Sequence, residues 1–140
     1  MNEAELEQIC RDEFGKIADF YSSEDKCVIK QIKYNEKNSL IYSASYYSSK
    51  LSDTNSNEGN TFIEFGIPEE RALIGNINCM NVNPAFRKKG FDKEMVSAVE
   101  EIFRRTGKIA VYSKCISDPE FWKRLGYSLN EKGNEGINTL

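Results

Sequence analysis

The sequence predicts an α+β domain built on a mixed α/β sheet, and three features lead to this prediction. Apolar residues near the N-terminus recur at steps of three and four, as on one face of a helix. Four β-rich segments follow, and after them come a second helical pattern, a short apolar segment and another short helix. Because 140 residues fit one compact unit, we expect residues 1–140 to form a single domain.

The first half of the chain contains one helix and most of the strands. The helical pattern extends from about Glu3 to Tyr21 and ends at Ser22-Ser23. The four β-rich segments are residues 27–34, 40–47, 61–67 and 72–82. The first two form a hairpin across the turn residues 35–38, and Gly75 in the fourth indicates a bulge or a close backbone approach. Residues 48–60 are polar and aperiodic, which favours a surface connection over a lid.

The second half returns to helical periodicity after Pro84. Five apolar residues form one helical face, and the helix ends near residues 104–107, where basic side chains precede a glycine. The five residues are Met95, Val96, Val99, Ile102 and Phe103. A short strand at 109–112 follows, and Ser117-Asp118-Pro119-Glu120 is a capping box that starts a short helix ending at Gly126. The tail, residues 127–140, has turn signals for a small hairpin.

The charge balance and the residue types exclude several functions. With 19 basic and 22 acidic residues the net charge is −3, whereas nucleic-acid binders are usually basic, so we expect no nucleic-acid partner. The sequence has no histidine, which excludes Ser-His-Asp triads, Cys-His dyads and His-ligated zinc. No apolar run is long enough to span a membrane, and the first residues are acidic. Four widely spaced cysteines, at positions 10, 27, 79 and 115, predict free thiols in a cytoplasmic protein without a bound metal.

Residues 82–92 are the segment most informative about function. A strand leads into a basic turn, and the turn opens onto an amphipathic helix, so several backbone N–H groups and the positive end of the helix dipole converge. Gly90 permits a close backbone approach, and Arg87, Lys88 and Lys89 add positive charge. This arrangement suits a phosphate or a pyrophosphate. A solvated basic turn without a ligand explains the same residues equally well.

Two segments resemble the signatures of the GNAT acyl-CoA-dependent N-acyltransferases. Residues 82–91 satisfy the pattern V-x-P-x-[YF]-[RQ]-x-x-G-x-[GA] up to its last position, which is Asp92. Residues 121–127, Phe-Trp-Lys-Arg-Leu-Gly-Tyr, are similar to the second signature, F-Y-x-[KR]-[LF]-G-[FY]. The resemblance covers about residues 72–128, with the expected helix and strand between the two signatures. It implies a GNAT-like fold shortened at the N-terminus, since the family usually has a strand before its first helix.

The resemblance also implies an activity and a cofactor site. Acetyl-CoA would be the acyl donor, an amine would be the acceptor, and the sheet would open between the strand ending at Val82 and the strand at 109–112. The pantetheine arm of acetyl-CoA would lie along Met80, Asn81 and Val82. The pyrophosphate of acetyl-CoA would bind the backbone amides of residues 88–92. The binding residues would be Arg87, Lys88, Lys89, Gly90, Phe91 and Asp92. Small enzymes of this family are often homodimers, and a net negative charge favours a cationic acceptor.

Several positions depart from the family pattern and leave an alternative open. Asp92 either repels a pyrophosphate or turns aside to cap a helix starting at Lys93. Trp122 occupies the position of a tyrosine that often serves as the general acid, and an indole cannot protonate a thiolate. The strand before the loop carries asparagines at 76, 78 and 81 in place of a basic carboxylate. Tyr112 is the candidate acid, with Glu64 and Cys115 as lesser candidates for a base and a nucleophile. The alternative is a catalytically silent GNAT-like module that binds acyl-CoA or a protein.

Overall fold

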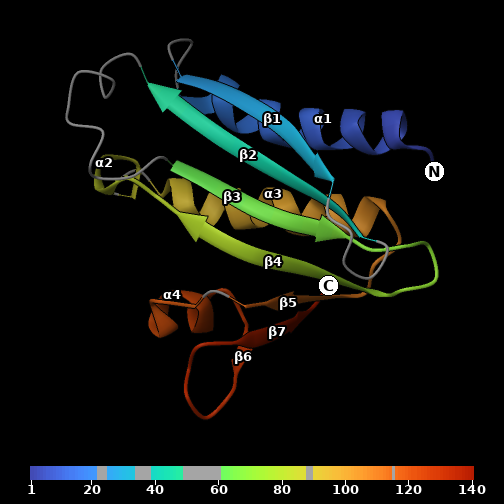
Figure 1. Ribbon diagram of the computed structural model, residues 1–140. Helices are drawn as coiled ribbons and strands as arrows, with labels where there is room; N and C mark the ends of the chain where they lie inside the picture. The colour runs from blue at the N-terminus through green and yellow to red at the C-terminus, as the bar shows by residue number, and fades with distance from the viewer. Residues whose placement is uncertain (22–24, 34–38, 49–60, 88–89, 115) are drawn as a thin grey trace.

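A single mixed sheet with two long helices on one face organises the protein (Figure 1). The computed structural model describes residues 1–21, 25–33, 39–48, 61–87, 90–114 and 116–140. Over these residues the sheet has seven strands in the order β1-β2-β3-β4-β5-β7-β6. The strands are β1 (Asp25–Lys33), β2 (Leu40–Ser48), β3 (Thr61–Ile67), β4 (Ile74–Asn81), β5 (Ala110–Ser113), β6 (Ser128–Leu129) and β7 (Gly136–Thr139). The helices are α1 (Glu3–Tyr21), α2 (Pro84–Arg87), α3 (Phe91–Arg105) and α4 (Pro119–Arg124).

Helix α1 forms because its apolar residues line up on one face and its first turn is stabilised. The Oδ1 atom of Asn2 accepts a hydrogen bond from the Glu5 backbone N–H at 2.9 Å, and the acidic Glu3 and Glu5 lie at the positive end of the helix. The buried face packs on the sheet, where the Phe14 ring lies 5.7 Å from the Phe65 ring. The Tyr46 hydroxyl donates a hydrogen bond to the Phe14 carbonyl at 3.2 Å. The predicted helix is confirmed over residues 3–21.

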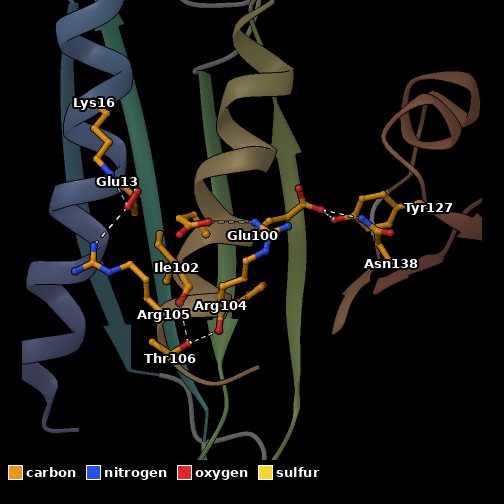
Figure 2. Close-up of polar contacts among 11 residues, drawn as sticks. Glu13, Lys16, Glu100, Ile102, Arg104, Arg105, Thr106, Tyr127 and Asn138 are labelled. Carbon is orange, nitrogen blue, oxygen red and sulfur yellow. Dashed lines mark hydrogen bonds and ion pairs between the residues drawn. The ribbon is translucent and has the colours of Figure 1, made fainter. Parts of the chain in front are cut away.

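An ion-pair cluster connects α1 and α3 (Figure 2). Glu13 on α1 is only 5% exposed, and its carboxylate contacts the Lys16 ammonium at 2.7 Å and the Arg105 guanidinium at 3.4 Å. A second Arg105 nitrogen contacts Asp12 at 3.4 Å. Because a carboxylate that loses water needs charged partners, these cations make the burial of Glu13 tolerable.

Strands β1 to β4 form an antiparallel meander, and β4 contains a bulge. Glu64 pairs with Cys79, whereas the next residue of β3, Phe65, pairs with Ile77, so Asn78 is an extra residue in β4. The predicted hairpin is confirmed by the antiparallel register of β1 and β2. Strand β4 is shorter at both ends than the predicted 72–82.

Gly75 marks a close approach of the backbone to α3, one of the two alternatives predicted for it. A Cβ atom at this position would lie 2.6 Å from three atoms of the Phe103 ring. Phe103 is fully buried on α3, so the missing side chain lets the helix lie directly on β4. The bulge in this strand lies elsewhere, at Asn78.

The C-terminal segment contains α4 and the predicted small hairpin, formed by β6 and β7. The N-cap of α4 is Asp118, whose side chain accepts a hydrogen bond from the Phe121 N–H at 3.4 Å, so the expected cap at Ser117 is wrong. Pro119 then occupies the first helical position, which suits its fixed φ angle. Gly126 ends the helix with a φ of 98°.

Some predicted features fall outside the described residues: Ser22-Ser23, the turn at 35–38, the polar segment 49–60, Lys88, Lys89 and Cys115. No helix in the described ranges is long and apolar enough to cross a membrane.

Candidate functional site

The sheet opens between its two central parallel strands. Strand β5 pairs with β4 only from Ile74↔Ala110 to Ile77↔Ser113, and the Lys114 N–H donates one further bond to the Ile77 carbonyl at 3.0 Å. Strand β4 continues to Asn81, while the chain after β5 turns away toward α4. Figure 1 shows the two strands together at one end and diverging toward α2 and α4. The opening predicted from the resemblance therefore lies between β4 and β5.

A narrow cleft of about 30 Å³ lies at this opening. Its walls come from the end of β4, from α2 and the start of α3, and from α4 with the residues before it. The lining residues are Met80, Val82, Arg87, Asp92, Ser117, Asp118, Phe121 and Trp122. Four of the predicted binding residues are thus brought together, and the second sequence motif contributes the opposite wall.

The predicted phosphate loop contains a short helix that the sequence analysis did not predict. Residues Pro84–Arg87 form the single turn α2. Gly90 then has φ 76° and ψ 20°, a left-handed conformation that glycine adopts without steric cost, and it is the N-cap of α3. The Gly90 N–H donates to the Arg87 carbonyl at 3.0 Å, so this amide is already engaged within the turn. The Phe91 ring is fully buried and lies 4.8 Å from Phe86, which anchors the start of α3 in the core.

The structure overturns the expectation that Asp92 caps a helix starting at Lys93. Helix α3 begins two residues earlier, at Phe91, and no side chain caps it. Asp92 lies inside the first turn, where its Oδ1 accepts a hydrogen bond from the Lys93 N–H at 2.9 Å. In this position its carboxylate interacts favourably with the positive end of the helix dipole. Because Asp92 also lines the cleft, its negative charge adjoins the place proposed for a pyrophosphate.

Tyr112 lies next to the opening, but its hydroxyl is hydrogen-bonded to a residue that does not line the cleft. Its hydroxyl donates to the Glu135 carboxylate at 2.5 Å, at the turn before β7. This hydrogen bond is the main reason that the pKa of Tyr112 is raised, and burial adds to it. An ordinary tyrosine is already protonated at neutral pH, so the raised pKa makes Tyr112 a weaker proton donor. Tyr112 is not among the residues that line the described cleft.

The second motif supplies packing groups. The Trp122 side chain is 2% exposed, and its ring makes edge contacts with Phe121 at 5.6 Å and with Tyr127 at 4.9 Å. Through these contacts Trp122 and Phe121 anchor α4. Glu64 alternates with the buried Ile63 and Phe65 along β3, so it lies on the face of the sheet that α1 and α3 do not cover.

Two residues at the opening were missed by the sequence analysis. Glu135 was only part of a turn signal, and its contact with Tyr112 depends on the pairing of β7 with β5. Ser113, the last residue of β5, is fully buried, and its hydroxyl has no hydrogen-bond partner in the part of the chain that the structure describes. In the same described ranges, no group of three or more acidic or cysteine side chains could hold a metal ion.

No protein-family model matches the sequence, and no curated protein matches it. Solved structures do match the fold. A GNAT-family acetyltransferase from Staphylococcus aureus Mu50 matches 100% of this chain and 96% of its own length, at 13% identity and a TM-score of 0.51. Ard1 from Thermoplasma volcanium matches over 70% of both chains, at 13% identity and a TM-score of 0.51. A tandem GNAT protein from the clavulanic acid biosynthesis pathway matches 67% of this chain and 30% of its own length, at 12% identity and a TM-score of 0.50.

A mixed α/β sheet that opens between two parallel strands beside a helix N-terminus defines the class of fold. The chain has the fold of the GNAT acetyltransferases, which confirms the fold class and the resemblance that the two sequence motifs carry.

Proposed function

We propose that the protein is an acyl-CoA-dependent N-acetyltransferase that transfers an acetyl group from acetyl-CoA to a primary amine. The observation that carries this proposal is the cleft between the end of β4 and α4, which lies where the sheet opens, beside the left-handed Gly90 at the start of α3. The acetyltransferases of the same fold support the proposed chemistry and do not favour a silent module.

The residues at the cleft fit acetyl-CoA, with one opposing charge. Met80, Asn81 and Val82 lie along the end of β4 and would hold the pantetheine arm. Arg87 and the positive end of α3 would attract the pyrophosphate, and Gly90 leaves no Cβ in its path. Asp92 opposes this attraction, so we expect the affinity for the donor to be lower than the basic loop alone would give.

The donor supplies an activated acyl group, so the task of the protein is to position the two substrates and to stabilise charge. An amine must lose a proton to attack, yet the asparagines of β4 are not bases. We therefore propose that the amine reaches the site already neutral or loses its proton to water. The net charge of −3 favours a cationic acceptor through long-range attraction.

The test is calorimetric titration of acetyl-CoA into the protein and into a matched pair of variants. Gly90 and Gly107 lie at opposite ends of α3 with φ angles of 76° and 82°, so an aspartate strains both backbones similarly. We expect Gly90→Asp to abolish binding, because it places a carboxylate at the phosphate site. Gly107→Asp should bind like the unmodified protein. Equal affinities for the two variants would contradict the site, and turnover with a panel of amines, followed as released thiol, tests the reaction itself.

A further inference from the structure

Ser113 carries a buried hydroxyl with an unused hydrogen-bonding capacity. Its side chain is fully buried, and Oγ has no partner among the described residues. Leaving a buried hydroxyl without a partner costs free energy, because the group loses its hydrogen bonds to water and gains none in return. Buried polar groups are nearly always paired, so an unpaired one in a native fold calls for an explanation, such as a bound ligand.

Ser113 lies where β4 and β5 part. It is the last residue of β5 in register with β4, and its partner there is Ile77. Paired residues on neighbouring strands point to the same face of a sheet. Since Ile77 is fully buried on the face covered by α3, the Ser113 hydroxyl also points into that face, at the inner end of the opening.

The outer end of the opening is the predicted pyrophosphate site at the start of α3. Between the two ends, β4 runs from Ile77 to Asn81, a length of roughly 13 Å for four residues of extended chain. A pantetheine arm can span such a length. If the pyrophosphate lies near Gly90 and the arm follows β4 inward, the thioester arrives beside Ser113.

We propose that the Ser113 hydroxyl donates a hydrogen bond to the carbonyl oxygen of the acyl thioester. This inference rests on the proposed function and adds a residue to it. A hydroxyl held in a buried, water-poor site is a good donor for an oxygen that gains negative charge during attack by an amine. No histidine exists to activate it, so Ser113 is a hydrogen-bond donor and not a nucleophile.

Tyr42 provides a matched control. Its hydroxyl is the other buried side-chain oxygen without a partner among the described residues, and Tyr42 is likewise fully buried. It lies on β2, where its ring stacks on Phe65 at 5.8 Å, and β2 is separated from β4 by β3. Ser113→Ala and Tyr42→Phe each remove one unpaired hydroxyl, so both variants should be at least as stable as the unmodified protein.

The experiment compares the binding of acetyl-CoA with that of S-ethyl-CoA, a thioether that lacks the carbonyl oxygen. We expect the unmodified protein and Tyr42→Phe to bind acetyl-CoA about tenfold more tightly than S-ethyl-CoA, because one hydrogen bond contributes about that much affinity. Ser113→Ala should bind both compounds equally, with an affinity for S-ethyl-CoA that is unchanged. In turnover with any amine that serves as acceptor, Ser113→Ala should reduce kcat on the order of 100-fold.

Each result has a definite meaning. A preference for acetyl-CoA that persists in Ser113→Ala overturns the role of Ser113 and leaves the proposed function standing. Failure of both compounds to bind the unmodified protein overturns the proposed function and the role of Ser113 together. A Ser113→Ala variant that melts at a lower temperature than Tyr42→Phe would show that the hydroxyl is needed for folding, and this also overturns the proposal.

Discussion

The Glu100 carboxylate on α3 accepts a hydrogen bond from the Tyr127 hydroxyl at 2.9 Å (Figure 2). The same Oε2 atom accepts a second hydrogen bond from the Asn138 side-chain amide on β7 at 3.1 Å. Tyr127 is the last residue of the second sequence motif and also packs on Trp122, which lines the cleft. One carboxylate therefore connects α3 to both the motif and the C-terminal strand, and so supports the cleft wall.

We expect this contact to contribute measurably to stability. Tyr127→Phe removes the donor from a buried, charge-assisted hydrogen bond, which should lower the free energy of unfolding by about 1.5–3 kcal/mol. Glu100→Gln, combined with Tyr127→Phe, gives a double-mutant cycle in urea denaturation, and the coupling should exceed about 1 kcal/mol. The exposed Lys123–Glu120 pair on α4 is the control, with an expected coupling below about 0.5 kcal/mol. Additive effects at Glu100 and Tyr127 would contradict the connecting role.

The same tyrosine predicts a loss of stability at alkaline pH. Burial and the neighbouring Glu100 raise the pKa of Tyr127 far above its ordinary value of 10.0. The folded protein therefore keeps the proton at a pH where the unfolded chain releases it, so the stabilisation is complete below pH 10 and decreases above it. The free energy of unfolding should fall above pH 10 by about 1.4 kcal/mol more per pH unit than in Tyr127→Phe. Parallel curves for the two proteins in urea denaturation at pH 10 to 11 would contradict the assignment.

The sequence was most informative where one local pattern determines an element. The helix at 3–21 and the strand at 61–67 were predicted within their observed bounds, because their apolar periodicities are regular. The helical turn at Pro84–Arg87 was missed, since four residues show no periodicity. The cap of α4 was assigned to Ser117, because a serine and an aspartate in sequence are both good caps and only the backbone distinguishes them.

The candidate site was predictable only in part. The family resemblance indicated Met80, Val82, Arg87 and Asp92, which meet at one cleft. The contact between Tyr112 and Glu135 and the unpaired hydroxyl of Ser113 depend on strand pairing between segments far apart in sequence, which no local pattern reveals.

Two glycines test the packing of the helices on the sheet. Gly75→Ala places a methyl group 2.6 Å from the buried Phe103 ring, and overpacking of this kind should cost about 1–3 kcal/mol of stability. Gly15 lies in α1 with nothing within 4 Å of an added Cβ, so Gly15→Ala should stabilise the protein by about 0.5–1 kcal/mol. Urea denaturation measures both. In the Gly75→Ala background, Phe103→Leu should recover part of the lost stability. If Gly75→Ala costs the same free energy with and without Phe103→Leu, the strain lies elsewhere.

We expect the negative charge of Asp92 to lower the affinity of the cleft for an anionic ligand. Asp92→Asn keeps an oxygen that can accept from the Lys93 N–H but removes the negative charge beside the start of α3. If a pyrophosphate binds there, its affinity should rise about 5- to 10-fold in low salt, and the gain should shrink as salt screens the charges. Glu94→Gln on the same helix changes the net charge equally, but Glu94 is exposed and does not line the described cleft.

We therefore expect Glu94→Gln to change the affinity less than twofold, because a charge in water is screened. Titration of acetyl-CoA and of adenosine 3′-monophosphate, which has the 3′-phosphate but no part of the pyrophosphate, into both variants separates the contributions of these two groups of the donor. A gain confined to acetyl-CoA would place Asp92 beside the pyrophosphate and away from the 3′-phosphate. An equal gain in Asp92→Asn and Glu94→Gln would show that overall charge governs binding, which would contradict a specific contact at the start of α3.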